Sequence, residues 1–287
     1  MAKAANTERL DTLVVERGLF DTKESARTAI MEGFVLVDGK PVNKPGHAVK
    51  MEAKLELSAS YQPPKYVSRG GLKLEKALSQ FGIDVSKRIC LDVGASTGGF
   101  TDCLLKHGAD FVYAIDVGYG QLDWKLRNDD RVKVLERVNA RNLSASALYG
   151  DPEEKPRADF ACMDVSFISA FKVLAGVLES MDSEKSEFVI LVKPQFEAGR
   201  QSVGHGGVVR DAAVHLEVLK TALEKSHQLG LFAHGIGYSP IKGPKGNIEF
   251  LLYLSRAKTA SLVDPCAIVE NAHKELAACG KSDEDGD

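Results

Sequence analysis

The chain has 287 residues, enough for one or two domains, with 44% hydrophobic and 27% charged residues and a formal net charge of −3. No apolar run approaches the ~18 residues of a membrane-spanning helix, and the N-terminal MAKAANTERLDTL lacks the pattern of a signal peptide. Because the five cysteines include no C-x-x-C pair, we expect free thiols in a reducing cytoplasm, without a disulfide or a zinc site. The net charge does not by itself indicate nucleic-acid binding, so such a surface would have to be a local patch.

The first 60 residues have the pattern of a small α+β domain. Apolar residues at helical spacing predict one helix that ends near Gly18 and a second that runs from an N-cap at Thr22 to Gly33. Two short strands flank Asp38-Gly39, a dipeptide favoured in tight hairpin turns, and another strand is predicted at 53–57. The apolar positions of the two helices are Leu10, Leu13, Val14, Ala26, Ala29 and Ile30.

The rest of the chain alternates between strand and helix patterns. We expect a domain at residues 7–60, a linker at 61–66 around Pro63-Pro64, and a doubly wound α/β domain at 67–264. Several of its strands are nearly continuous apolar runs, which is typical of parallel strands covered on both faces. The strands are predicted at 88–93, 111–116, 132–136, 158–164, 187–193, 232–239 and 248–254, with helices between most of them, including 98–107 and 211–229.

Two segments of this region are less regular. The loop at 197–208 carries four glycines and is either a mobile flap over a site or an ordinary exposed loop. Residues 265–287 form a C-terminal segment of unassigned role, and their acidic end, SDEDGD, is expected to be disordered and solvated.

The turn after the first strand of the α/β domain has the composition of a ligand pocket. In LDVGASTGGFTD the glycines follow a strand and precede a helix, which permits close backbone approach to a ligand. The spacing matches neither a dinucleotide-binding fingerprint nor a P-loop. Carboxylates at successive strand ends suit S-adenosylmethionine better than a nucleotide, although each aspartate alone could be a helix cap. The expected cofactor residues are Asp92, Gly94, Ala95, Ser96, Gly98, Gly99, Phe100, Asp116, Val117, Asn139, Ala140 and Asp164.

Four charged residues lie where a catalytic site is expected. Asp164 and Lys193 end the fourth and fifth predicted strands of the α/β domain, whose carboxyl ends meet at one crevice. Lys73 precedes the first of these strands, and Glu249 begins the last one. No histidine has a zinc-ligand spacing, so we expect no metal.

The motifs SRGGLKL, LDVGASTGGFTD, AIDVGYGQL, DVSFIS and LVKPQFE carry a resemblance. From residue 65 to 254 the chain resembles the FtsJ-type RNA 2′-O-methyltransferases, and as a whole it resembles the TlyA family, whose members are also called haemolysins. The segment ERLDTLVVERGLFDTKESARTAIMEGFVLVDGKPVNKPG resembles an S4-type RNA-binding domain. Thr22-Lys23 stands where many S4 domains have Ser-Arg, which keeps a helix cap and a cation.

The resemblance implies a fold and a reaction. The fold would be a Rossmann-like methyltransferase sheet with an antiparallel last strand, preceded by a small α+β S4-type domain. The reaction would be S-adenosylmethionine-dependent 2′-O-methylation of ribosomal RNA at cytidine, with Lys73, Asp164, Lys193 and Glu249 as the catalytic set. We expect Lys193 to activate the hydroxyl, Asp164 to orient Lys193, and the other two residues to hold the ribose. The cations expected to meet RNA phosphates are Arg9, Lys23, Arg27 and Arg69.

Three other functions stay open at this point. A haemolysin-like, membrane-active protein is disfavoured because the sequence shows no membrane span and no cationic amphipathic helix. A non-catalytic ribosome-assembly factor is disfavoured because the four charged residues and the glycine turn are complete. A small-molecule methyltransferase is disfavoured by the S4-type segment.

Overall fold

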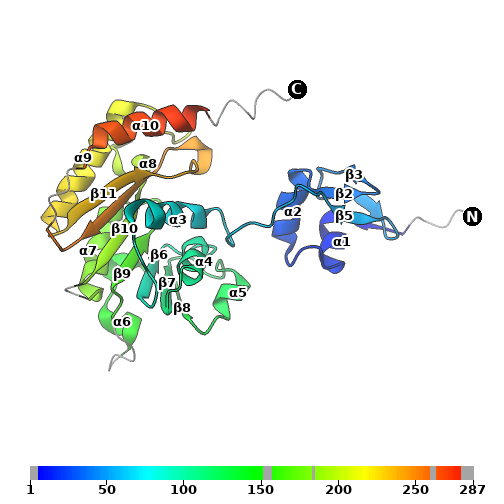
Figure 1. Ribbon diagram of the computed structural model, residues 1–287, viewed down its shortest axis with the longest axis horizontal. Helices are drawn as coiled ribbons and strands as arrows, with labels where there is room; N and C mark the ends of the chain where they lie inside the picture. The colour runs from blue at the N-terminus through cyan, green and yellow to red at the C-terminus, as the bar shows by residue number, and fades with distance from the viewer. Residues whose placement is uncertain (1–5, 151–156, 183–184, 259–262, 279–287) are drawn as a thin grey trace, which may run out of the picture. The chain divides into compact units, whose positions relative to one another are not determined.

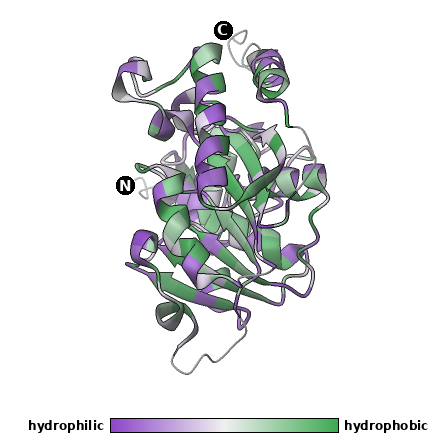
Figure 2. Ribbon diagram, turned by 90° about the vertical axis from the view of Figure 1, so that its left-hand side faces the viewer, coloured by the Kyte–Doolittle hydropathy of each residue, from purple (hydrophilic) through white to green (hydrophobic). Residues whose placement is uncertain are grey.

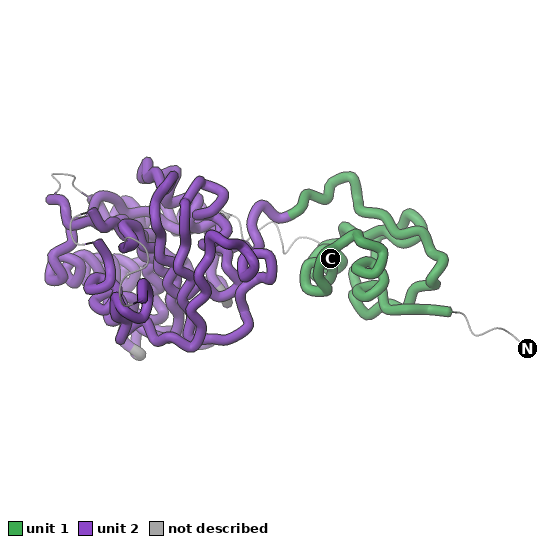
Figure 3. The backbone as a smooth tube through the Cα atoms, turned by 90° about the horizontal axis from the view of Figure 1, so that it is seen from below, with its two compact units in different colours: residues 1–63 green, residues 64–287 purple. Residues whose placement is uncertain are grey.

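The computed structural model describes residues 6–150, 157–182, 185–258 and 263–278 (Figure 1). The chain forms two compact units, residues 1–63 and residues 64–287 (Figure 3). The acidic end at 282–287, for which disorder is expected, lies outside the described residues. Each unit is described by itself below.

The N-terminal unit packs two helices against short strands. Helices α1 (Leu10–Glu16) and α2 (Lys23–Met31) contact each other, and the side chain of Thr22 caps α2 by accepting a hydrogen bond from the Ser25 N–H at 3.2 Å. The predicted apolar positions of both helices are buried together in one core. The strands are β1 (Thr7–Arg9) paired with β4 (Ala48–Lys50), and a sheet of β3 (Lys40–Pro41), β2 (Val35–Val37) and β5 (Leu55–Leu57).

The second unit is built on a seven-stranded mixed sheet of order β11-β12-β10-β9-β6-β7-β8. Strands β6 to β10 are parallel, whereas β12 runs antiparallel to both of its neighbours. This arrangement confirms the predicted Rossmann-like sheet with an antiparallel last strand. The strands are β6 (Ile89–Val93), β7 (Phe111–Asp116), β8 (Val132–Glu136), β9 (Phe160–Met163), β10 (Glu187–Val192), β11 (Phe232–Tyr238) and β12 (Phe250–Ser255).

Helices cover both faces of this sheet, so that its strands are buried on both sides (Figures 1 and 2). One apolar core lies between the sheet and α3 (Gly70–Phe81), α4 (Gly99–Lys106) and α5 (Trp124–Arg127). The other lies between the sheet and α6 (Ala145–Tyr149), α7 (Ala170–Ser180) and α9 (Ala212–Gln228). Helix α10 (Pro265–Ala278) packs on α9 and β11, which gives the previously unassigned segment after residue 264 a structural role.

The region at 197–208 follows α8 (Pro194–Glu197) and includes a 3-10 turn at Arg200–Ser202. Within the described residues, no helix has the length and apolar character to cross a bilayer. Cys90, Cys103 and Cys162 are buried free thiols, whereas Cys266 is a free thiol that is exposed.

The turn between β6 and α4 closely approaches the backbone that follows β9. Gly94 and Gly98 have φ values of 86° and 96°, a region that favours glycine. A Cβ atom on Gly94 would lie 2.7 Å from the backbone oxygen of Asp164, which follows β9. The sequence therefore needs glycine here to bring the carboxyl ends of β6 and β9 together.

Candidate active site

A cavity of about 530 Å³ opens at the carboxyl ends of β6, β9 and β10. The glycine turn after β6 forms one wall, the first turn of α3 forms another, and the loop before β12 forms a third. The residues that line it are Ser68, Arg69, Gly70, Lys73, Gly94, Ala95, Ser96, Thr97, Gly99, Phe100, Asp164, Ser166, Lys193, Ile241, Lys242, Gly243 and Lys245.

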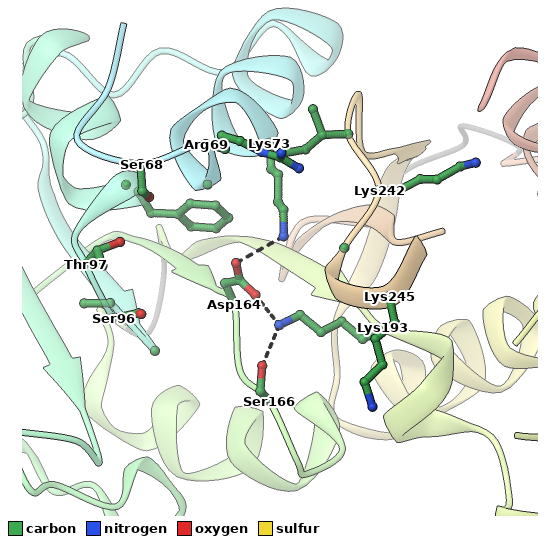
Figure 4. A pocket seen from close by; sticks show the side chains of 17 residues that line it. Ser68, Arg69, Lys73, Ser96, Thr97, Asp164, Ser166, Lys193, Lys242 and Lys245 are labelled. Atoms are coloured by element: carbon green, nitrogen blue, oxygen red, sulfur yellow. Dashed lines mark hydrogen bonds and ion pairs between the residues drawn. The ribbon is translucent and has the colours of Figure 1, made fainter. Parts of the chain in front are cut away.

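Three of the four predicted catalytic side chains, Lys73, Asp164 and Lys193, line this cavity, and the fourth, Glu249, is buried behind Lys73. Lys193 Nζ lies 2.5 Å from Asp164 Oδ1 and donates a hydrogen bond to Ser166 Oγ at 2.8 Å (Figure 4). Lys73 Nζ lies 3.6 Å from the other oxygen of Asp164 and donates to Glu249 Oε2 at 2.6 Å. The result is a continuous row of alternating charges, Glu249, Lys73, Asp164 and Lys193.

Burial makes this row unusual, because charged side chains are rarely removed from water, and when they are they need partners such as those in this row. The side chain of Glu249 is 0% exposed and those of Lys73 and Lys193 are 9% and 8% exposed. Asp164 is the most open member at 19%. Glu249 Oε1 is buried without a hydrogen-bond partner in the described structure, so the row still has an unused acceptor.

Strand pairing explains how such distant positions converge. Asp164 and Lys193 directly follow β9 and β10, which are parallel neighbours and therefore end at one edge of the sheet. Strand β12 is antiparallel to β10 and pairs Phe250 with Val192, so the residue before Phe250 lies at that same edge. Because β12 runs antiparallel to β10, it is the beginning of β12, and with it Glu249, that lies at the edge where β9 and β10 end.

The expected cofactor residues fall into two groups. The cavity is lined by Gly94, Ala95, Ser96, Gly99 and Phe100, together with Asp164. The others lie outside its lining: Asp92, Gly98, Asp116, Val117, Asn139 and Ala140.

Asp116 holds the turn after β7 against the glycine turn. Its carboxylate accepts hydrogen bonds from the backbone N–H groups of Ser96 at 2.8 Å and of Gly118 at 2.7 Å. The next residue, Val117, is 71% exposed. After β8, the Asn139 side chain accepts from the Arg141 N–H at 3.1 Å and caps a short 3-10 turn that begins at Ala140. These residues lie at the carboxyl ends of β7 and β8, next to Ser96 in the wall of the cavity.

Asp92 is placed differently from the expectation. Its side chain is fully buried beneath the glycine turn, where Thr101 Oγ1 donates a hydrogen bond to Asp92 Oδ2 at 2.7 Å. Burial raises the pKa of Asp92 to about 7. Asp92 therefore holds the first turn of α4 and is not among the residues that line the cavity, because alternation along β6 points its side chain toward α4.

A buried clasp joins the two segments that carry Asp164 and Lys193. Glu197, at the end of α8, accepts hydrogen bonds from Ser169 Oγ and from the Ala170 N–H, each at 2.7 Å. Burial raises the pKa of this carboxyl, and Lys225 lies 3.7 Å away. The clasp fixes the start of α7 to the end of α8, so the segments after β9 and β10 are held at both of their ends.

Sequence reasoning did not identify several of the lining residues. Ser166 stands in the DVSFIS motif, but nothing in the sequence indicates its hydrogen bond to Lys193. Lys242 and Lys245 belong to a Gly/Pro-rich segment, IKGPKGN. Two lysines in so short a loop are the sequence feature that could have indicated an anion-binding role. Their placement depends on which strand pairs with β10, and local pattern does not reveal that.

The predicted RNA-binding cations lie on both units. In the N-terminal unit, Arg9 and Arg27 both pair with the buried carboxylate of Asp11, at 2.8 and 3.0 Å, and this holds the pKa of Asp11 well below its usual range. Both arginine side chains remain 54% exposed. Lys23 is exposed at the start of α2, and Arg69 lines the cavity of the second unit.

Comparisons with known proteins identify both parts of the chain. The model of the FtsJ-like methyltransferase family matches residues 66–256, and that of the S4 domain matches residues 8–55. The chain is 47% identical to a provisionally named rRNA methyltransferase, YqxC, of Bacillus subtilis, over 94% of this chain and 95% of that protein. It is 42% identical to the 16S/23S rRNA (cytidine-2′-O)-methyltransferase TlyA of Mycobacterium tuberculosis, over 95% and 98%.

A solved structure from Streptococcus thermophilus, provisionally named a hemolysin, superimposes with a TM-score of 0.73 at 41% identity, covering 97% of this chain and all of that one. The likeness extends over both units and confirms the family that the motifs indicate. The chain belongs to the TlyA family, whose members join an S4 domain to an FtsJ-like methyltransferase domain.

Proposed function

We propose that the chain transfers a methyl group from S-adenosylmethionine to the ribose 2′-hydroxyl of a cytidine in ribosomal RNA. The observation that carries this proposal is the row of alternating charges beside a glycine turn, at one cavity. The substrate class is supported by the names of the relatives from Bacillus subtilis and Mycobacterium tuberculosis and by the S4 domain.

The residues present fit S-adenosylmethionine. The glycine turn exposes backbone to the cavity, and Asp116 stands at the end of β7, where a carboxylate can accept hydrogen bonds from ribose hydroxyls. The walls offer no P-loop to grip a phosphate chain, and Asp164 supplies a negative charge near a sulfonium. When bound, the cofactor supplies an electrophilic methyl group.

The chain's own residues position and activate the hydroxyl. For the transfer, Lys193 first gives up its own proton to water; the amine then accepts the 2′-hydroxyl proton as the oxygen attacks, while Asp164 and Ser166 hold Nζ in place. Lys73 lies next in the row and faces the ribose side of the site, and the buried Glu249 holds Lys73 in place. A positioned proton acceptor contributes roughly 10²–10⁴-fold, and alignment of the reacting atoms contributes ~7–11 kcal/mol in well-oriented model systems.

Phe167 offers a surface for the base of the target nucleotide. It follows Ser166, is 92% exposed and has a φ of 67°, which is strained for a bulky residue. Its ring centroid lies 5.4 Å from that of Phe196, and the residue before it, Ser166, lines the cavity. Enzymes that act within RNA splay out the target nucleotide and stack its base on aromatic side chains.

We expect Phe167→Ala to weaken the use of RNA without affecting the cofactor. Loss of one base-stacking contact costs roughly 1–3 kcal/mol, so KM for RNA should rise while the Kd for S-adenosylmethionine stays unchanged. Phe167→Tyr keeps the aromatic face and is the matched control. Equal kinetics for the alanine variant and the wild type would exclude this stacking role.

The proposed function is tested directly with the full chain. Purified protein, S-adenosylmethionine with a tritiated methyl group, and ribosomal subunits lacking the modification are incubated, and the product RNA is mapped by mass spectrometry. The expected result is one 2′-O-methyl group on a cytidine. A methyl group on a base, or RNA binding without transfer, would overturn the proposal. Leakage of lipid vesicles by the pure protein, again without transfer, would favour the membrane-active alternative.

A further inference from the structure

The cavity carries an excess of positive charge. Five cationic side chains line it, against the single carboxylate of Asp164. Glu249 lies behind them and is already paired with Lys73. The five cations are Arg69, Lys73, Lys193, Lys242 and Lys245.

Three of these cations take no part in the catalytic row. Within the described residues, Arg69, Lys242 and Lys245 have no carboxylate at ion-pairing distance, whereas Lys73 and Lys193 do. The proposed methyl donor, with a sulfonium, an ammonium and one carboxylate, has a net positive charge and cannot neutralise them. These three cations are therefore available to meet an anionic group of the other substrate.

The loop that carries the two lysines is fixed against the catalytic row. A Cβ atom on Gly243 would lie 2.1 Å from Glu249 Oε1, so the backbone touches that carboxylate directly. The Gly243 N–H donates to the Asn247 carbonyl at 2.9 Å. The Asn247 side chain accepts from the Val209 N–H and donates to the Gly207 carbonyl, both at 3.0 Å.

Lys245 is held in this loop with a φ of 62°, a conformation that most side chains avoid. Its side chain is exposed and that of Lys242 is half-buried, so both ammonium groups can reach a ligand from water. The loop thus presents its charges from a pre-organised backbone, which lowers the entropic cost of binding.

The position of the loop fits the geometry of methyl transfer. In Figure 4, Asp164 and Lys193 lie between Ser96 and Thr97 on one side and Lys242 and Lys245 on the other. Ser96 and Thr97 belong to the glycine turn, where the cofactor is proposed to bind. An in-line transfer needs the nucleophile on the far side of the methyl group, which is the side of the two lysines.

We propose that Lys242 and Lys245 bind the backbone phosphates that flank the target ribose, opposite the cofactor. This proposal rests on the proposed function, since it assigns the RNA side of the same site. Each ammonium group would act as a point charge on a phosphate, which positions the strand without reading its sequence.

The test compares Lys242→Gln/Lys245→Gln with Lys87→Gln. Lys87 is also an exposed loop lysine with a positive φ, 59°, but it precedes β6 and so lies at the opposite edge of the sheet. Methyl transfer to ribosomal RNA and equilibrium RNA binding are measured between 50 and 300 mM salt, and cofactor binding by titration calorimetry.

We expect the double variant to raise KM for RNA and to make the salt dependence shallower. Each lost phosphate contact reduces the slope of log K against log salt by roughly 0.7–0.9, so the double variant should lose ~1.4–1.8. Cofactor binding and the Lys87→Gln variant should match the wild type, and Lys242→Arg/Lys245→Arg should restore the wild-type slope.

A wild-type slope and KM in the double variant would overturn the inference. RNA binding gives the same slope test when no methyl is transferred, so failure of the inference is distinguishable from failure of the proposed function. A melting temperature equal to that of the wild type shows that the variant is folded. If the double variant is not folded, the same measurements are made on Lys242→Gln and Lys245→Gln separately.

Discussion

Lys193→Ala will abolish methyl transfer and leave binding of S-adenosylmethionine intact. The substitution removes the nitrogen that lies 2.5 Å from Asp164 and 2.8 Å from Ser166, and with it the amine that is the only proposed acceptor for the 2′-hydroxyl proton. The rate should fall by at least the roughly 10²–10⁴-fold attributed to a positioned general base. Asp164 keeps Lys73 at 3.6 Å, so the carboxylate is not left without a partner and the fold should persist.

Two further variants separate proton transfer from charge. Lys193→Arg keeps a cation beside Asp164, but a guanidinium does not lose its proton in proteins and cannot serve as a base. Ser166→Ala removes only the hydrogen bond to Nζ and should reduce kcat far less. Tritium transfer to ribosomal RNA gives the activities, and titration calorimetry gives cofactor binding. Near-normal transfer by the arginine variant would show that Lys193 acts through its charge, and near-normal transfer by the alanine variant would remove it from the mechanism.

The regular parts of the fold follow from local pattern. Thr22 caps the predicted helix, and the strand patterns at 88–93, 111–116 and 187–193 correspond to β6, β7 and β10. In each case a periodic apolar run and its boundary lie within one segment, so no long-range information is needed.

The elements that were missed have weak local signals. Strands β1 and β4 have three residues each and are defined by pairing with each other across the N-terminal unit. Helix α3 begins at Gly70-Gly71, residues with low intrinsic helix propensity, yet it carries Lys73 into the cavity. Tertiary packing overrides propensity there.

The candidate site divides in the same way. Asp164 and Lys193 are predictable because parallel neighbours end at one edge, a rule of the fold class. Lys242 and Lys245 reach the cavity, and Glu249 reaches its buried position beside Lys73, only because β12 pairs antiparallel with β10. Asp92 points toward α4 because of its register on β6. The family resemblance supplied Glu249, whereas the two lysines needed the structure.

Breaking the buried Lys73–Glu249 pair from one side will cost both stability and activity, whereas replacing both residues will restore stability alone. Glu249→Ala leaves the ammonium of Lys73, 9% exposed, with only Asp164 at 3.6 Å. Breaking a buried pair from one side costs roughly 3–5 kcal/mol in free energy of unfolding, and because the contact with Asp164 remains, we expect a loss near the lower end of that range. Apolar residues of similar volume are often tolerated in place of the whole pair. Lys73→Met/Glu249→Met should therefore unfold close to the wild type and still transfer no methyl group.

Urea unfolding followed by circular dichroism measures this in the full chain, because most of the described helical residues belong to the second unit. The matched control is Glu75→Ala, since Glu75 is on the same helix as Lys73. This substitution breaks an exposed ion pair with Lys65 and should cost no more than ~1 kcal/mol. Equal unfolding of Glu249→Ala and Glu75→Ala would mean that the pair is not desolvated. In that case burial of the Lys73–Glu249 pair could not be what holds Lys73 beside Asp164.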